Sequence, residues 1–464
     1  MAKKDSKKDA QDAPKKLERL QAVRGMKDIL PEDHAYYTLI KKVIRHRARQ
    51  AGFRRISTPI LEDKNVFTRA VGDATDIVEK ELYTLTTKED GPEFAMKPEG
   101  TAGVMRAFIE HGMGSLPQPV ELYYIEPHFR HDRPQKGRYR QFHQFGFEVL
   151  GESDPAIDAQ IIQIVHHVHD DLQIADGLRL EINTIGSLED RERYIEHLRD
   201  FFIGKERNLC EQCVKRLETN PLRILDCKEE DCRLLAGMAP KLSDHLSKES
   251  QDHYAKTKEL LDIAGIEYTE NPALVRGLDY YSHTVFEFVS ENGLSVGGGG
   301  RYDGLAEQLG GAHTPACGYA GGIERVIALM KEARLTVPNK DNVDIFVAQL
   351  GWEAKKVAMR ILSELREQGA HTLGALGTAS MKSQLGKADK FQVKYTIILG
   401  EVEIREGRAI IRDMAKGVQE IVPLRSVVKE VIAKLGKQNL DMYDPSDDIG
   451  VEAVDPADEL LIRD

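Results

Sequence analysis

The stretch LYYIEPHFRHDRPQKGRYRQFHQFGFEVLG, residues 122–151, carries the pattern around which the chain is organised. Apolar and polar residues alternate at both of its ends, which predicts two β-strands joined by a loop. Successive side chains of a strand point to opposite faces of a sheet. One face of the second strand therefore carries Arg140, Phe142, Gln144, Gly146 and Glu148. The opposite face carries Gln141, His143, Phe145, Phe147 and Val149.

The connection between these two strands is strongly basic. The first strand is expected to end at Arg130, and the loop then contains Arg133, Pro134, Lys136, Gly137 and Arg138. A polar strand face beside a mobile basic loop suits a pocket in which strand residues hold a small molecule and cations hold phosphates. An ordinary exposed hairpin with a solvated tip would give the same pattern, so the stretch alone favours neither interpretation.

The composition indicates a globular protein of two or three domains. The chain has 464 residues, of which 41% are hydrophobic and 30% charged. Its net charge is −11, but residues 441–464 hold nine acids and one arginine, which leaves −3 for the rest. Local basic patches remain compatible with that balance, so RNA binding is not excluded.

The sequence also bears on the compartment. No apolar run approaches the roughly 20 residues of a membrane span, and the N-terminus has no apolar core of a signal peptide. Five cysteines, an odd number, in a chain this long favour a reducing compartment. We therefore expect a cytoplasmic protein with no membrane partner.

Residues 21–335 are expected to form one ordered domain, after a disordered tail over residues 1–20. Apolar residues at helical spacing predict a helix from Asp33 to Gln50. The segment FRRISTPIL, residues 53–61, follows as a strand that Pro59 disturbs. A long helix packed on such a strand can bury the protein's own core or a partner subunit.

Polar groups gather where the next strand ends. Phe94 to Met96 close this strand, and a helix is predicted to start directly after Thr101. Thr101 could be merely the N-cap of that helix. Glu99, at the strand terminus, is placed where a carboxylate could meet an ammonium ion.

Residues 188–271 differ in character and are interpreted as an inserted domain. They are polar, helical and rich in Glu and Lys, and they contain Cys210, Cys213, Cys227 and Cys232. Four thiolates at this spacing could form a tetrahedral zinc site. Buried or reduced free thiols are the alternative, and the wide spacing of the second pair favours that alternative, so no metal is assigned.

Strand patterns return after the insertion. The segment ALVRGLDYYSHTVFEFV, residues 273–289, predicts a central strand in which Arg276 needs an anionic partner. Four consecutive glycines, residues 297–300, would let a ligand approach a strand closely. A glycine-containing strand then leads into a helix with Glu324 and Arg325 in its first turns. These glycine spacings are not those of dinucleotide or P-loop sites.

Beyond Pro338, alternating strands and helices predict a compact α/β domain over residues 340–435 with a mostly parallel sheet. Lys382, Lys387, Lys390 and Lys394 cluster around one predicted helix, either as a modest basic footprint or as a solvated face. An acidic tail over residues 436–464 completes the chain, and the sequence assigns it no function.

Taken together, these motifs resemble those of bacterial-type histidyl-tRNA synthetases, a family of class II aminoacyl-tRNA synthetases, from about Val23 to Leu435. The segment ending at Pro59 looks like motif 1, FRHDRPQKGRYRQFHQFGFE like motif 2 and GGIERVIALM like motif 3. KPEGTA, RGLDYY and GGGGRYDGL resemble segments of the histidine-specific members. The family usually has Arg at position 97, where this chain has Lys97, and it varies at residues 282–284.

The resemblance implies an α+β fold: an antiparallel-sheet catalytic core with a helical insertion, followed by a C-terminal α/β anticodon-binding domain. It implies a homodimer that uses L-histidine, ATP with Mg²⁺, and tRNA(His). Arg130 and Arg276 would be catalytic, with Arg130 and Arg325 on ATP. Histidine would be bound by Glu99, Gly100, Thr101, Gln144, Glu148, Tyr280 and Tyr281.

Two functions are compatible with this resemblance. The first is a histidine–tRNA ligase that forms histidyl-adenylate and pyrophosphate, then transfers histidine to the 3′ end of its tRNA. The second is a non-catalytic relative that senses histidine or tRNA, or that serves as a regulatory subunit. Such relatives are expected to lose phosphate-binding arginines or the anticodon domain, and this chain has both, which favours the enzyme.

Overall fold

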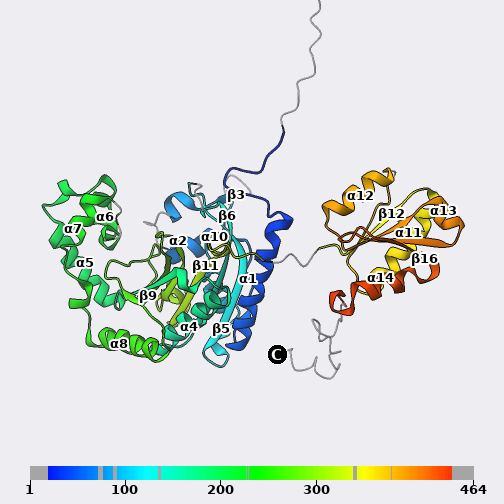
Figure 1. The fold of residues 1–464 in the computed structure, drawn as a ribbon. Helices are drawn as coiled ribbons and strands as arrows, with labels where there is room; N and C mark the ends of the chain where they lie inside the picture. Colours follow the sequence, from blue (N-terminus) through cyan, green and yellow to red (C-terminus); the bar gives the residue numbers. More distant parts are fainter. Residues whose placement is uncertain are drawn as a thin grey trace, which may run out of the picture. The chain divides into compact units, whose positions relative to one another are not determined.

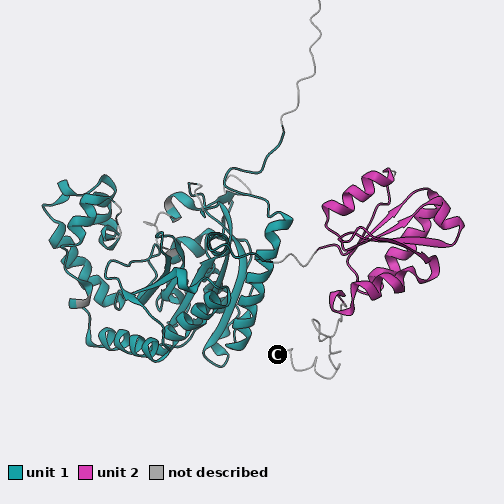
Figure 2. Cartoon of the chain, in the orientation of Figure 1, with its two compact units in different colours: residues 1–337 teal, residues 338–464 magenta. Residues whose placement is uncertain are grey.

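The computed structural model divides the chain into two compact units, residues 1–337 and 338–464 (Figure 2). The residues it describes are 19–71, 77–86, 91–133, 137–225, 227, 229–337, 342–377 and 379–441. Most of the expected N-terminal tail, most of the acidic tail, and Pro134 and Lys136 of the basic loop lie outside the described residues.

An eight-stranded sheet forms the centre of the first unit, in the order β1-β5-β6-β11-β10-β9-β7-β8. Its internal pairings are antiparallel, and only the outer pairs β1–β5 and β7–β8 are parallel. The strands are β1 (Arg54–Arg55), β5 (Val120–Phe129), β6 (Gln141–Leu150), β7 (Leu178–Thr184), β8 (Thr269–Glu270), β9 (Ser282–Ser290), β10 (Ser295–Arg301) and β11 (Ala316–Gly322). The expected α+β class with an antiparallel core is confirmed.

The two predicted strands of residues 122–151 are β5 and β6, paired from Val120 opposite Leu150 to Phe129 opposite Gln141. The predicted alternation is confirmed, because Phe145, Phe147 and Val149 are all buried in one apolar cluster. That cluster also contains apolar residues of α1 (Pro31–Gln50), α4 (Pro155–Asp171) and α10 (Ile323–Glu332). These helices therefore cover one face of the sheet and leave the polar face of β6 on the other side (Figure 1).

The other face of the sheet carries smaller elements. They are α2 (Lys64–Val71), α3 (Thr101–Glu110), α9 (Leu305–Gln308) and a three-stranded sheet ordered β2-β4-β3, of β2 (Leu61–Asp63), β3 (Thr84–Thr86) and β4 (Glu93–Met96). Apolar residues of α2, α3 and α9 join a second cluster, which includes Leu122 and Tyr124 of β5. Adjacent residues of β5 thus alternate between the two clusters, as a strand buried on both faces requires.

Two predicted strands are wrong in extent. In the segment 53–61 only β1 is a strand before β2 begins, and residues 56–60, which include Pro59, are irregular. Residues 271–281 are also irregular, so Arg276 lies in a loop before β9 and not in a central strand. The carbonyl groups of Gly277 and Asp279 in this loop accept hydrogen bonds from arginine side chains, which replace the bonds of a sheet.

Four helices build most of residues 188–271: α5 (Leu188–Phe202), α6 (Glu211–Thr219), α7 (Glu230–Ala236) and α8 (Lys248–Ile263). Figure 1 shows α5, α6 and α7 grouped at one side of the first unit. α5 begins with a capping box, in which Ser187 and Asp190 satisfy each other's backbone N–H groups. Asp190 also accepts hydrogen bonds from Ser247 and Ser250, which ties the starts of α5 and α8 together.

The second unit has a five-stranded sheet in the order β13-β12-β14-β15-β16. The strands are β12 (Ile345–Gln349), β13 (Thr372–Gly374), β14 (Tyr395–Leu399), β15 (Arg408–Asp413) and β16 (Gln419–Pro423). The helices are α11 (Trp352–Glu367), α12 (Met381–Lys390), α13 (Glu401–Arg405) and α14 (Val427–Leu435). The expected α/β domain is present.

The prediction of a mostly parallel sheet is wrong for the second unit. β12 is parallel to β13 and β14, but β15 is antiparallel to both β14 and β16. A tight turn at Gly417, whose φ is +69°, joins β15 to β16, and two strands joined so closely can pair only in opposite directions. Within the described residues of the whole chain, every helix is too short or too polar to cross a membrane.

Candidate functional site

A cavity lies against the sheet of the first unit and receives most of the residues that the sequence singled out. It encloses about 870 Å³ of space free of protein atoms, part of it open to solvent. Its lining includes Glu99, Thr101, Arg130, Gln144, Arg276, Tyr280, Tyr281 and Arg325. Gly100 and Glu148 are the two predicted site residues that do not line it.

Five parts of the fold bring these side chains together. Arg130 directly follows β5, Gln144 belongs to β6, and Arg325 lies in the first turn of α10. Glu99 and Thr101 lie at the start of α3, and the loop before β9 contributes Arg276, Tyr280 and Tyr281. Because these segments are far apart in sequence, only the folded sheet makes them one site.

Glycines of β10 form part of the cavity wall. A Cβ atom at Gly298 would stand 2.7 Å from the backbone carbonyl oxygen of Phe286, closer than real Cβ atoms approach. Gly297 and Gly298 both line the cavity, so the four-glycine run provides a wall that other groups can approach closely.

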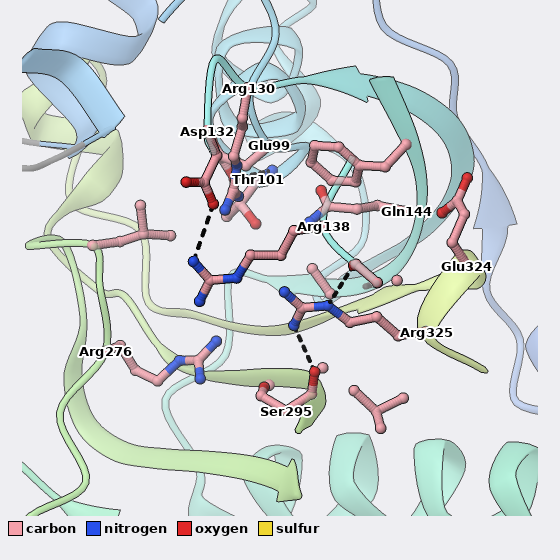
Figure 3. A pocket seen from close by; sticks show the side chains of 18 of the residues that line it. Glu99, Thr101, Arg130, Asp132, Arg138, Gln144, Arg276, Ser295, Glu324 and Arg325 are labelled. Atoms are coloured by element: carbon pink, nitrogen blue, oxygen red, sulfur yellow. Dashed lines mark hydrogen bonds and ion pairs between the residues drawn. The ribbon is translucent and has the colours of Figure 1, made fainter. Parts of the chain in front are cut away.

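Four guanidinium groups line the cavity, those of Arg130, Arg138, Arg276 and Arg325. Arg130 donates through Nε to the Pro98 carbonyl at 2.8 Å. Arg138 donates to Asp132 at 3.1 Å. Figure 3 shows Arg138, Arg276 and Arg325 entering from different elements, with bonds from Arg138 and Arg325 dashed.

Arg276 has a carboxylate partner but keeps donor capacity. Its Nη1 donates to Glu287 of β9 at 2.8 Å, and the Ser295 hydroxyl donates to the same carboxylate. Its Nε is shielded from solvent and has no hydrogen-bond partner among the described residues. The expected anionic partner of Arg276 is therefore present, and a second anion could still bind.

The cationic groups repel one another in this cavity. Arg325 donates to the carbonyl groups of Ser295 at 2.5 Å and Gly137 at 3.3 Å. Burial, together with the neighbouring Arg130 and Arg138, lowers the pKa of Arg325 to about 10. An anion bound between these side chains would relieve that repulsion, so the cavity favours phosphate or carboxylate ligands.

The cavity also contains acceptor groups. The backbone N–H groups of Thr101 and Ala102 donate to the Glu99 carboxylate at 2.7 and 2.9 Å, which fixes its position at the start of α3. Burial raises the pKa of Glu99. Gln144 Oε1 is shielded from solvent and lacks a partner within the described residues. A buried carboxylate and an unpaired amide oxygen that line the same cavity suit an ammonium group.

Glu148 lies beneath the cavity instead of lining it. Its carboxyl group accepts hydrogen bonds from Tyr302 at 2.5 Å and from Thr101 at 2.8 Å. It is fully buried, and burial raises its pKa to about 8. A Cβ at Gly318 of β11 would collide with this carboxyl group, so glycine is required there. Glu148 thus positions Thr101 from behind.

Glu324 is a site residue to which the sequence assigned no role. It lines the cavity and accepts hydrogen bonds from the Tyr37 hydroxyl at 3.1 Å and the His143 N–H at 3.0 Å. These bonds connect α10 to α1 and β6. The sequence signal that could have identified Glu324 as a site residue was its position beside Arg325 in the first turn of a predicted helix.

Other lining residues were also missed. Phe142 lies under the Arg130 guanidinium, 5.5 Å from ring centroid to Cζ, and the alternation of β6 already put Phe142 on the face of Gln144. Asp132 also lines the cavity and was not singled out, whereas Arg138 belongs to the basic loop whose cations the sequence offered as phosphate ligands.

The loop that carries Arg276 is supported by the inserted helices. Arg191 of α5 donates to the carbonyl groups of Asp279 and Tyr281, both at 2.9 Å. Asn220 donates to the Asp279 carboxylate at 2.7 Å. No local sequence pattern predicts these contacts, because each partner lies in a separate segment.

Lys97, which departs from the family pattern, is buried, and the hydrogen bonds of its side chain go to residues outside the predicted site. Its ammonium group donates to the Thr58 carbonyl at 2.9 Å and pairs with Glu126.

Comparisons with known proteins identify the family to which the chain is similar. A family model described as histidyl-tRNA synthetase matches residues 25–326, and one described as anticodon binding domain matches residues 344–434. A curated relative named histidine–tRNA ligase, from Dehalococcoides mccartyi, is 42% identical over 414 residues, covering 89% of this chain and 99% of the relative.

Solved structures show the same likeness. The apo histidyl-tRNA synthetase of S. aureus is similar with a TM-score of 0.74 and 34% identity, over 89% of this chain and 99% of that chain. A Bacillus halodurans structure, titled as an ATP phosphoribosyltransferase regulatory subunit/histidyl-tRNA synthetase, matches with a TM-score of 0.60. It is 20% identical, over 83% of this chain and 99% of that chain, and shows the fold alone.

The pKa of Glu148 predicts a pH dependence of stability. Its pKa rises from 4.5 to about 8 on folding, so the folded chain holds a proton that the unfolded chain has lost between these values. This contribution to the free energy of unfolding is complete below about pH 4.5 and is lost as pH rises through about 8. We expect Glu148→Gln to unfold with a smaller pH dependence in this range.

Thermal unfolding of both proteins at several pH values between 5 and 8.5, a range set by the titration of one carboxyl group, measures the difference. Glu211→Gln, whose side chain is 90% exposed, is the matched control and should follow the unsubstituted chain. Parallel curves for Glu148→Gln and the unsubstituted chain would contradict the prediction.

Proposed function

The chain belongs to the histidyl-tRNA synthetase family, and we propose from this premise that it is an ATP-dependent histidine–tRNA ligase that works through the cavity described above. It activates L-histidine to histidyl-adenylate and transfers the histidine to the 3′ end of its tRNA. The observation that carries the assignment of the site is the pairing, in one cavity, of an arginine cluster with a buried acceptor pair, Glu99 and Gln144.

The first reaction joins two anions. A histidine carboxylate oxygen forms a bond to the α-phosphorus of ATP while the bond from that phosphorus to the bridging oxygen breaks, and pyrophosphate leaves. Such a displacement depends on positioning and charge neutralisation more than on proton transfer. We assign Arg130 and Arg276 as the catalytic residues, because both cations line the cavity and come from opposite sides of its wall, β5 and the loop before β9.

Arg325 is assigned to the ATP phosphates, together with Arg130. Its lowered pKa supports this role, since a phosphate beside it would restore a favourable environment for its charge. Mg²⁺ binds mainly to ATP phosphates and needs few protein carboxylates. Asp132 in the cavity lining and Glu287 beside Arg276 fit that need, and the ion would neutralise phosphate charge.

Histidine is assigned to the acceptor groups of the cavity. Its ammonium group would be received by Glu99 and Gln144, with the Thr101 hydroxyl beside them. Gly100 leaves room for Tyr124, whose ring a Cβ at that position would strike. The imidazole would meet Tyr280 and Tyr281, while Glu148 acts through Thr101 and Tyr302. A polar pocket of this kind rejects apolar amino acids, because its buried groups would be left unpaired.

We assign the first unit as the catalytic domain, with residues 188–271 as its insertion, and the second unit as the part that binds the tRNA anticodon, as the family match over residues 344–434 suggests. A homodimer is supported by Ile60, Leu61 and Leu85, which are 44%, 48% and 44% exposed near the β2-β4-β3 sheet. Because its substrates are those of translation, the chain is proposed to work in the cytoplasm.

The alternative, a non-catalytic sensor or regulatory subunit, lacks a specific observation in its favour. Such a protein would not need catalytic arginines, whereas Arg130, Arg276 and Arg325 all line the cavity. The family match to an anticodon-binding domain likewise favours the ligase.

The exchange of pyrophosphate into ATP tests the proposed function directly. We expect exchange with L-histidine and with none of the other nineteen standard amino acids, because Glu99, Gln144 and the tyrosines match its polar groups. Comparable exchange with proline, threonine or glycine would reject the specificity. Absence of exchange with histidine would favour the sensor.

Substitution of Arg276 tests its catalytic role. We expect Arg276→Ala to lower the exchange rate on the order of 10²-fold or more, because one fixed charge is lost from the transition state. Histidine binding and the thermal midpoint should change much less. Arg179→Ala, at a side chain that is 56% exposed on β7, is the matched control. Near-normal turnover of Arg276→Ala would show that the residue is misassigned.

Removal of the second unit separates the two reactions. A chain ending at Val337 keeps the complete cavity and both apolar clusters of the first unit, so it should fold, dimerise and retain appreciable exchange. Charging of tRNA should fall far more steeply, through weaker tRNA affinity. Light scattering and both activities are measured on the same preparation. A parallel loss of exchange and charging would reject the anticodon assignment.

A further inference from the structure

Four cysteines of the inserted helices meet in one place, away from the cavity lining. Cys210, Cys213, Cys227 and Cys232 each offer an Sγ atom, and these atoms all lie within 4.8 Å of one another. We propose that they bind one Zn²⁺ ion as thiolates. This ion would fix the segment between the two cysteine pairs, whose side chains hold the loop of Arg276 in place. The metal site lies beyond the proposed ligase activity.

The spacing of the sulfur atoms fits a tetrahedral metal site. Zinc binds thiolates at about 2.3 Å, which places two ligands at the corners of a tetrahedron about 3.8 Å apart. The Sγ atoms of Cys210 and Cys227 are 3.9 Å apart. A disulfide needs about 2.05 Å, so the sulfur atoms are spaced for a shared ion and not for a bond.

The backbone around the cluster is arranged to orient thiolates. Cys210 is the N-cap of α6, and Cys213 lies in the first turn of that helix. The backbone N–H of Cys210 donates to Cys232 Sγ at 3.1 Å. Hydrogen bonds of this kind fix ligand orientation around structural metal sites.

Three of the four thiols are buried, and Cys210 is half-buried, so the cluster is closed to substrates. Four protein ligands with no open position are typical of a structural zinc site. Simple packing of thiols in an apolar core is the alternative. Packing requires only that sulfur atoms contact apolar neighbours, whereas here each sulfur lies beside the three others.

The segment between the two cysteine pairs connects the cluster to the cavity. Asn220 and Arg223 lie between Cys213 and Cys227, and they contact the loop that carries Arg276. Asn220 donates to the Asp279 carboxylate at 2.7 Å, and Arg223 donates to the Gly277 carbonyl at 3.2 Å. An ion that joins both pairs would fix both ends of this segment, and through it the loop.

Metal analysis of the full chain tests the site. After purification without chelators and dialysis against Zn²⁺-free buffer, we expect about one zinc per chain, released when a mercurial reagent titrates the thiols. After replacement by Co²⁺, the visible absorption of tetrahedral thiolate-bound cobalt should appear. Zinc content near zero after reconstitution with Zn²⁺, or a disulfide among these cysteines in reduced preparations, would overturn the proposal.

Variants identify the ligands. Cys213→Ser and Cys232→Ser should lose the metal, and Cys210→His should retain it, since imidazole is also a zinc ligand and this position is half-buried. Cys317→Ser, at the one cysteine outside the cluster, is the matched control and should retain it. Full zinc content in a Cys213→Ser, Cys232→Ser double variant would also overturn the assignment.

The link to the cavity has its own readout. Zinc removal from the unsubstituted chain should lower histidine-dependent exchange about 10-fold or more, because a misplaced loop displaces Arg276, and added zinc should restore it. Unchanged exchange after complete removal would overturn the link. Zinc content is measured without any assay of activity. A failure of the ligase proposal can therefore be told apart from a failure of the zinc proposal.

Discussion

The crowding of guanidinium groups around one cavity is the constraint on which the arrangement of the first unit depends. Arg130, Arg138, Arg276 and Arg325 all line the cavity, and burial with mutual repulsion lowers the pKa of Arg325 to about 10. Burying like charges is unfavourable unless an anion joins them, so the site is arranged for a ligand that brings negative charge. ATP and the carboxylate of an amino acid both bring it. Before such a ligand binds, Glu287 pairs with Arg276 and Asp132 pairs with Arg138.

The antiparallel sheet makes this arrangement possible because one of its faces stabilises the fold and the other lines the cavity. The face covered by α1, α4 and α10 is apolar and stabilises the fold, as the burial of Phe145, Phe147 and Val149 illustrates. The other face of β6 presents Phe142 and Gln144 to the cavity. The loop before β9 belongs to neither layer and is held by Arg191, Asn220 and Arg223 from the insertion, so the inserted helices help to support the wall of the cavity.

Local periodicity was enough to predict β5, β6 and the faces of their side chains, because a strand's period is set by its own backbone. It failed for Arg276, since its loop is ordered by side chains 54 to 90 positions earlier in the chain. The resemblance implied that Glu148 binds histidine; the structure buries it against Tyr302 and Thr101, outside the cavity lining, and its contact with a substrate stays a prediction. The direction of β15 was missed because the alternation of strands and helices does not reveal a hairpin.

A crystal structure with a non-hydrolysable histidyl-adenylate analogue would test the assignment of the cavity most directly. The account predicts that the group replacing the phosphate lies within hydrogen-bond reach of Arg130 and Arg276, and that the ammonium group lies between Glu99 and Gln144. An analogue bound outside this cavity, or bound in it with its ammonium group among the arginines, would contradict the account.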